Sequence, residues 1–89
     1  MGIESVLFKS EEKKQKAEVA NILRTIADKL DNGSMILKQD ASEIELEFPE
    51  QMILELKVEE EKGKRLKKSL EIELEWIVGD TGTSPTQIL

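Results

Sequence analysis

Apolar and charged residues alternate through most of the second half of the chain. The apolar positions form three rows, one in residues 44–48, one in residues 52–58 and one in residues 66–76. A β-strand points successive side chains to opposite faces, so a period of two predicts strands with one apolar face and one charged face. Met35 and Leu37 predict a further short strand, and residues 3–9 predict a first one.

One segment has the period of a helix instead. Its apolar residues recur at steps of three and four and therefore share one stripe: Val19, Ile22, Leu23, Ile26, Ala27 and Leu30. We expect a helix over residues 15–32, ended by Gly33 in the left-handed conformation. The Lys14-Gln15-Lys16 start provides no good N-cap side chain.

These elements predict an α+β fold in the order β-α-β-β-β-β. The apolar face of a roughly five-stranded antiparallel sheet needs a cover, and the helix stripe is the apolar surface available to it. We expect one amphipathic helix packed on one face of that sheet, with strand order 2-3-4-5-1. Gly63 is expected to take a positive φ in the last turn. We expect residues 1–78 to form a single domain and residues 79–89, which lack a period, to form a flexible tail.

Composition excludes several kinds of chemistry. The 89 residues include no Cys and no His, which removes disulfides, thiolate nucleophiles and the commonest general base and metal ligand. The net charge of −6 arises entirely after residue 33 and disfavours nucleic-acid binding. No apolar run reaches the roughly 18 residues of a membrane span. We therefore expect a cytoplasmic protein that is not an enzyme and that has no cofactor, no bound metal and no membrane partner.

Two segments together resemble the amphi-Trp domain family. The first is the helix end Leu23-Arg24-Thr25-Ile26-Ala27-Asp28-Lys29-Leu30-Asp31-Asn32-Gly33, and the second is the strand Leu70-Glu71-Ile72-Glu73-Leu74-Glu75-Trp76, with Phe8 upstream. The resemblance covers roughly residues 6–76. It implies a small prokaryotic domain without an assigned activity, so it supplies no catalytic residue. Lys68 interrupts the last apolar row, and the helix lacks the Ser or Thr cap of the family.

Trp76 is the first candidate for an interaction site. Tryptophan combines a large apolar area with one N–H donor and is common at interface hot spots. The alternative is that it packs on the helix, as the end of the core row Ile72, Leu74 and Trp76.

The charged face of the sheet is the second candidate. If Phe48 opposes Met52, Glu45 faces Glu55, and Glu73 lies on the last strand of the same face. Such carboxylates suit docking of a basic partner, weak cation binding or acid–base catalysis; the alternative is a plain solvated face. Ile53 is an apolar residue on this face, joined in one interpretation by Ile77, and marks either a self-association patch or a harmless exposed position.

Two further motifs give only weak indications of function. Asp80-Thr81-Gly82 matches only a tripeptide of the retroviral-type aspartic proteases. The basic residues of the last hairpin are best interpreted as partial neutralisation of the acidic sheet, with phosphate binding as the alternative: Lys62, Lys64, Arg65, Lys67 and Lys68. The sequence thus favours a non-enzymatic protein-interaction or accessory domain, whose partner is another protein or a second copy. The alternative is a module that binds a cation or small ligand on its acidic face.

Overall fold

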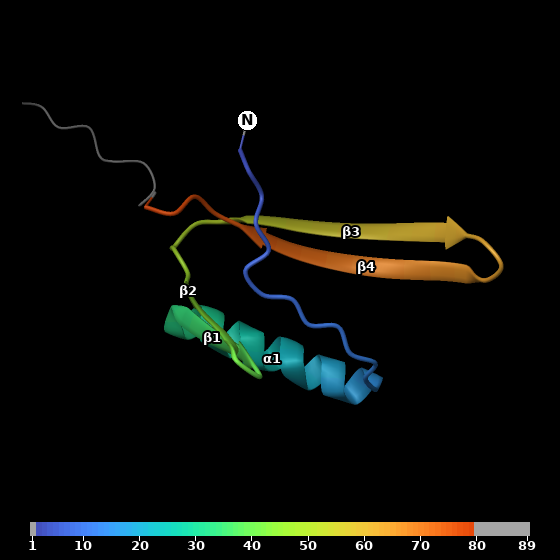
Figure 1. Cartoon of the computed structure of the whole chain (residues 1–89), viewed down its shortest axis with the longest axis horizontal. Coiled ribbons are helices and arrows are strands. Elements are labelled where there is room, and N and C mark those ends of the chain that lie inside the picture. Colours follow the sequence, from blue (N-terminus) through green and yellow to red (C-terminus); the bar gives the residue numbers. More distant parts are fainter. Residues whose placement is uncertain (1, 80–89) are drawn as a thin grey trace, which may run out of the picture. The chain divides into compact units, whose positions relative to one another are not determined.

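The structure is a computed structural model that describes residues 2–79. It contains one helix, α1 (Lys16–Asn32), and four strands, β1 (Ser34–Gln39), β2 (Ser42–Glu47), β3 (Ile53–Lys62) and β4 (Leu66–Glu75) (Figure 1). The predicted α+β class is confirmed. The chain divides into two compact units, Met1–Phe48 and Pro49–Leu89. The Asp80-Thr81-Gly82 motif and the tail from residue 80 onward lie outside the described residues.

Helix α1 begins within one residue of the predicted start. Gln15 is the N-cap, in an extended conformation and without a side-chain hydrogen bond to the helix. The helix ends as predicted at Gly33, whose φ of 99° is in the left-handed region. The Gly33 N–H donates to the carbonyl oxygens of Lys29 and Leu30 at 2.9 and 3.2 Å, which satisfies acceptors left open by the last turn.

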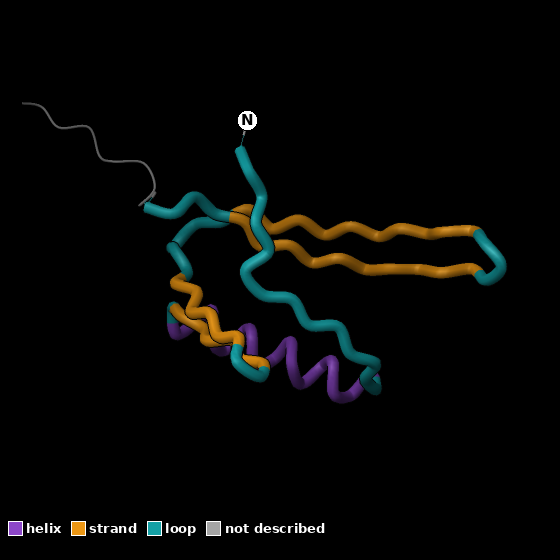
Figure 2. Tube along the Cα trace, viewed as in Figure 1, coloured by secondary structure: helices purple, strands orange, loops and turns teal. Residues whose placement is uncertain are grey.

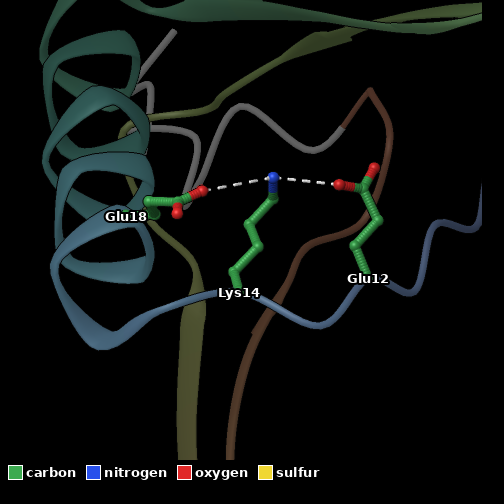
Figure 3. A network of polar contacts seen from close by, with 3 residues as sticks. All are labelled: Glu12, Lys14 and Glu18. Atoms are coloured by element: carbon green, nitrogen blue, oxygen red, sulfur yellow. Dashed lines mark ion pairs between the residues drawn. The ribbon is translucent and has the colours of Figure 1, made fainter.

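A small ionic network lies at the start of α1. Lys14 Nζ is 2.9 Å from Glu12 Oε2 and 3.8 Å from Glu18 Oε2 (Figure 3). The hydrogen bond with Glu12 is the main cause of a raised pKa for Lys14. Glu18 also lies in the first turn, where a carboxylate is favoured by the helix dipole. The network therefore joins the preceding loop to a helix start that has no capping side chain.

Strands β1 and β2 form an antiparallel hairpin closed by Asp40-Ala41. Gln39 pairs with Ser42 at the turn, where Asp40 takes a φ of 52°, a conformation that Asp tolerates better than most residues. At the open end the Phe48 N–H donates to the Gly33 carbonyl oxygen at 2.8 Å. Gly33 thus both ends α1 and anchors the base of the hairpin.

Helix α1 packs against β1 within the first unit (Figure 2). One face of the hairpin is half-buried through Met35, Leu37, Ile44 and Leu46, whereas Ile36 on the other face is 58% exposed. On the helix, Ile26 and Leu30 are half-buried, while Val19, Ile22 and Leu23 are each about 44–45% exposed. The side chains of the predicted apolar stripe are therefore least exposed in the last two turns of α1.

Strands β3 and β4 form a longer hairpin of ten residues a side. Their antiparallel register runs from Ile53 opposite Glu75 to Lys62 opposite Leu66. The turn falls at residues 63–65, where the Gly63 N–H donates to the Arg65 carbonyl oxygen at 3.4 Å. Gly63 does not have a positive φ, so that expectation was wrong: the turn has three residues, and none of them takes the left-handed conformation that two-residue hairpin turns favour.

The expectation of one five-stranded sheet in the order 2-3-4-5-1 is also wrong. The described residues form two two-stranded sheets, β1-β2 and β3-β4, and residues 2–15 contain no strand. A two-residue turn favours pairing of β2 with β1, whereas the link from β2 to β3 contains Pro49, which cannot donate a backbone hydrogen bond. In residues 3–9, Val6, Leu7 and Phe8 are consecutive, which breaks the alternation of a half-exposed strand.

Candidate interaction surface

The β3–β4 hairpin has one face composed of aliphatic side chains. Three cross-strand pairs form it, Leu54 with Leu74, Leu56 with Ile72 and Val58 with Leu70. We call these six residues the apolar face. Leu74 is half-buried, and the other five are between 49% and 73% exposed. Clustered apolar exposure is a feature of many surfaces through which proteins interact.

A charge pair ends the apolar face towards the turn. Glu60 lies opposite Lys68, and Lys68 Nζ is 4.0 Å from Glu60 Oε1. Glu60 and Lys68 come two residues after the Val58–Leu70 pair, so they lie on the same side of the hairpin as the apolar face. The interruption of the apolar row at Lys68 is therefore matched across the strand by Glu60, and the pair forms a polar boundary of the face.

The opposite side of the hairpin, the charged face, contains a lysine between two carboxylates. Lys57 Nζ is 2.8 Å from Glu59 Oε1 and 3.3 Å from Glu71 Oε2. The hydrogen bonds with Glu59 and then Glu71 raise the pKa of Lys57. The hydrogen bond with Lys57 lowers the pKa of the Glu59 carboxyl below its ordinary value of 4.5. All three groups are exposed, so solvent screening limits what these ion pairs add to stability.

Two of the predicted site residues meet on the charged face. Glu55 lies directly opposite Glu73, an arrangement that costs tenths of a kcal/mol when solvated. Glu45 lies in β2 opposite Ile36, and β2 and β3 belong to separate two-stranded sheets, so the expectation that Glu45 faces Glu55 was wrong. Within residues 2–79, no group of three or more Asp, Glu, His or Cys side chains is placed to hold a metal ion.

The family of the chain follows from its sequence taken as a whole. A model of the Amphi-Trp domain matches residues 1–88. The chain belongs to the Amphi-Trp domain family. No curated protein and no solved structure matches the chain. The family description assigns no activity, so the surface of this Amphi-Trp domain is the basis for any proposal about function.

Trp76 and Ile53 lie at the open end of the β3–β4 hairpin in this Amphi-Trp domain. Trp76 directly follows the last residue of β4 and is half-buried. Ile53 lies opposite Glu75 on the charged face and is 66% exposed, and Ile77 beyond β4 is exposed as well. No helix in residues 2–79 is long and apolar enough to cross a membrane.

The ion pair between Lys57 and Glu59 on the charged face is expected to weaken in acid. Because the pKa of Glu59 is lowered by folding, its pairing with Lys57 adds stability above about pH 4.5, and this is lost as the pH falls through the lowered value. We expect Lys57→Met to raise the titration midpoint of Glu59, measured by NMR of its carboxyl carbon. In Lys67→Met the midpoint should stay unchanged, since Lys67 makes no ion pair with Glu59. An equal midpoint in wild type and Lys57→Met would contradict the contact.

The apolar face was not singled out by the sequence interpretation, which assigned its residues to the core. Strand length was the signal that could have identified it. The apolar rows of residues 52–58 and 66–76 continue into strands of ten residues, whereas β1 and β2 have six each. The apolar stripe of one helix is too narrow to cover two strands of six residues and two of ten residues.

Proposed function

We propose that this Amphi-Trp domain is a non-enzymatic protein-interaction or accessory module that binds a polypeptide through the apolar face of its β3–β4 hairpin. The observation that supports it best is the exposure of Leu54, Leu56, Val58, Leu70 and Ile72 on one face of a two-stranded sheet. A scattered exposed Leu or Val is ordinary, but a contiguous group bounded by charges is typical of a binding surface.

The absence of Cys and His from the sequence supports a non-enzymatic role. These residues supply the usual nucleophiles and the general base most common near neutral pH. The carboxylates on the charged face lie on an open sheet surface rather than in a desolvated pocket, so their surroundings do not favour the raised pKa that acid catalysis needs.

A cation or small-ligand site on the charged face is the second candidate, and it has less support. Glu55 and Glu73 offer two opposed carboxylates, but Lys57 with its ion pairs occupies the next cross-strand position. A divalent cation such as Ca²⁺ needs six to eight oxygen ligands, and two exposed carboxylates supply few of them.

Site-specific photo-crosslinking tests the proposed surface. A benzophenone amino acid at Val58 probes the apolar face, and the same amino acid at the neighbouring Glu59 probes the charged face. After irradiation in cells, we expect polypeptide adducts from position 58 and few from position 59. Adding Leu56→Glu to the position-58 protein should remove those adducts. Equal adducts from both positions, or none from position 58, would contradict the proposed function.

A further inference from the structure

We propose that Asn32 is a modification site, at which the side-chain amide is converted spontaneously to a carboxylate at a rate controlled by the C-terminal end of α1. Asn32 is exposed, is the last residue of α1 and directly precedes Gly33. These two residues are the single Asn-Gly pair of the sequence, since the other asparagine, Asn21, precedes Ile22. Asn32 lies outside the apolar face, so its modification does not depend on the proposed function.

The reaction needs only water and the chain itself. The backbone nitrogen of Gly33 loses its proton to hydroxide and attacks the side-chain carbonyl carbon of Asn32. A C–N bond forms, and the side-chain nitrogen takes a proton from water and leaves as ammonia. Water then opens the resulting five-membered imide. Cleavage of the new C–N bond gives aspartate, whereas cleavage of the original peptide bond gives isoaspartate, in which the main chain runs through the side-chain carbons.

Gly33 favours ring closure, and the residue after Asn21 does not. Glycine has no side chain to shield its backbone nitrogen, and apart from its chain neighbours no atom lies within 4 Å of where a Cβ would be at Gly33. Asn21 is followed by the β-branched Ile22, which crowds the attacking nitrogen. The side-chain oxygen of Asn21 also accepts a hydrogen bond from Arg24 Nη1 at 2.8 Å. Asn21 is therefore an internal control for Asn32.

The folded end of α1 opposes the reaction. The Gly33 N–H donates to the carbonyl oxygens of Lys29 and Leu30 at 2.9 and 3.2 Å, so the attacking nitrogen is held in hydrogen bonds. Asn32 is helical, and its main chain must leave the helical conformation before the five-membered ring can close. Both restraints are lost when the last turn opens, and helix ends open more readily than the rest of a fold. The rate of conversion at Asn32 therefore measures how often this turn is open.

The products disturb the junction that Gly33 forms. Isoaspartate adds a methylene group to the main chain, which displaces Gly33 relative to the groups it binds. Its hydrogen bonds with Lys29, Leu30 and Phe48 then lose their alignment. Either product also adds a negative charge next to Asp31 at the C-terminal end of α1, where the helix dipole disfavours it. The modification therefore favours further opening of the same turn.

Peptide mass spectrometry of the full chain tests the site. The purified protein is kept at mildly alkaline pH, once folded and once unfolded in urea, and is then briefly digested with trypsin. Trypsin places Asn21 in residues 17–24 and Asn32 in residues 30–38. In the folded chain, we expect the aspartate and isoaspartate forms of residues 30–38 to accumulate at least about tenfold more slowly than in urea. Residues 17–24 should stay unmodified in both samples over the same period.

Three results would contradict the proposal. No conversion at Asn32 in urea, or equal conversion at Asn21 and Asn32, would overturn the site. Equal rates at Asn32 in the folded and the unfolded chain would overturn its control by α1. Asn32→Gln checks the chemistry, because glutamine would need a six-membered ring, and it should form neither product at this position.

Two variants separate opening of the helix end from a general loss of packing on α1, and circular dichroism checks that each still folds. Leu30→Ala shortens a half-buried side chain in the last turn, and Val19→Ala shortens one in the first turn. In folded protein, Leu30→Ala should raise the rate at Asn32 about threefold or more, whereas Val19→Ala should leave it unchanged. In urea both should match wild type. An unchanged rate in Leu30→Ala, or equal increases in both variants, would overturn control by the helix end.

Discussion

Replacing Gly33 with valine should lower the free energy of unfolding by about 1–2 kcal/mol, because a β-branched residue is strained in the left-handed region. The φ of Gly33 is 99°, and its backbone both ends α1 and binds the Phe48 N–H. No atom lies within 4 Å of the position where a Cβ would be added, so the penalty comes from the backbone rather than from a clash. For a chain of this size the melting temperature, followed by far-ultraviolet circular dichroism, should fall by roughly 5–15 °C.

Two controls isolate the conformational cause. Asparagine tolerates the left-handed region better than other residues with a Cβ, so Gly33→Asn should recover much of the loss. Gly63 has open space around it and no positive φ, so Gly63→Val should change the free energy of unfolding by less than about 0.5 kcal/mol. Similar losses for valine at both glycines would show that the helix end is not held in the conformation described.

Leu37→Lys should destabilise the first unit by about 2 kcal/mol, since it introduces a charge on the hairpin face that packs against α1. Leu37 is half-buried and pairs with Ile44 on that face. Urea unfolding followed by circular dichroism measures the difference. The loss is smaller than at a fully buried site because the lysine stem can lie along the apolar surface with its ammonium group in water.

The neighbouring residue provides the matched control. Ile36→Lys adds the same side chain one position earlier in β1, where it lies on the exposed face opposite Glu45. Opposite charges across a strand pair are favourable, so this variant should stay within about 0.5 kcal/mol of wild type. If Ile36→Lys were the more damaging variant, the orientation of β1 relative to α1 would be wrong.

Local features of the fold could be predicted from the sequence because each depends on a short, regular pattern. The stripe from Val19 to Leu30 and the glycine after it define α1 to within a residue. The alternating rows predict β2, β3 and β4, and the hairpin turn at residues 63–65 overlaps the turn expected around Gly63. These patterns determine where elements begin and end, and which side chains share a face.

Pairing between strands could not be predicted in the same way, because alternation determines the face of a strand and not its neighbour. The row ending at Phe48 could pair with β1 on one edge and with β3 on the other, but only the pairing with β1 forms, and Pro49 interrupts the link to β3. The expected juxtaposition of Glu45 with Glu55 depended on the pairing of β2 with β3 and was wrong. The juxtaposition of Glu55 with Glu73 depends only on the β3–β4 register, which one turn sets.

The Glu60–Lys68 pair has a consequence for the tendency of the β3–β4 hairpin to form fibres. Short, uncharged strand segments of high β-propensity are the segments that stack into amyloid. Without this pair, the apolar side of β3 and β4 would extend almost to the turn, and the outer edges of a ten-residue hairpin would offer a long template for added strands. A charge on each strand at the same level limits the uninterrupted aliphatic part of this face to three residues a side, and the six- or seven-residue segments that stack into amyloid have low net charge.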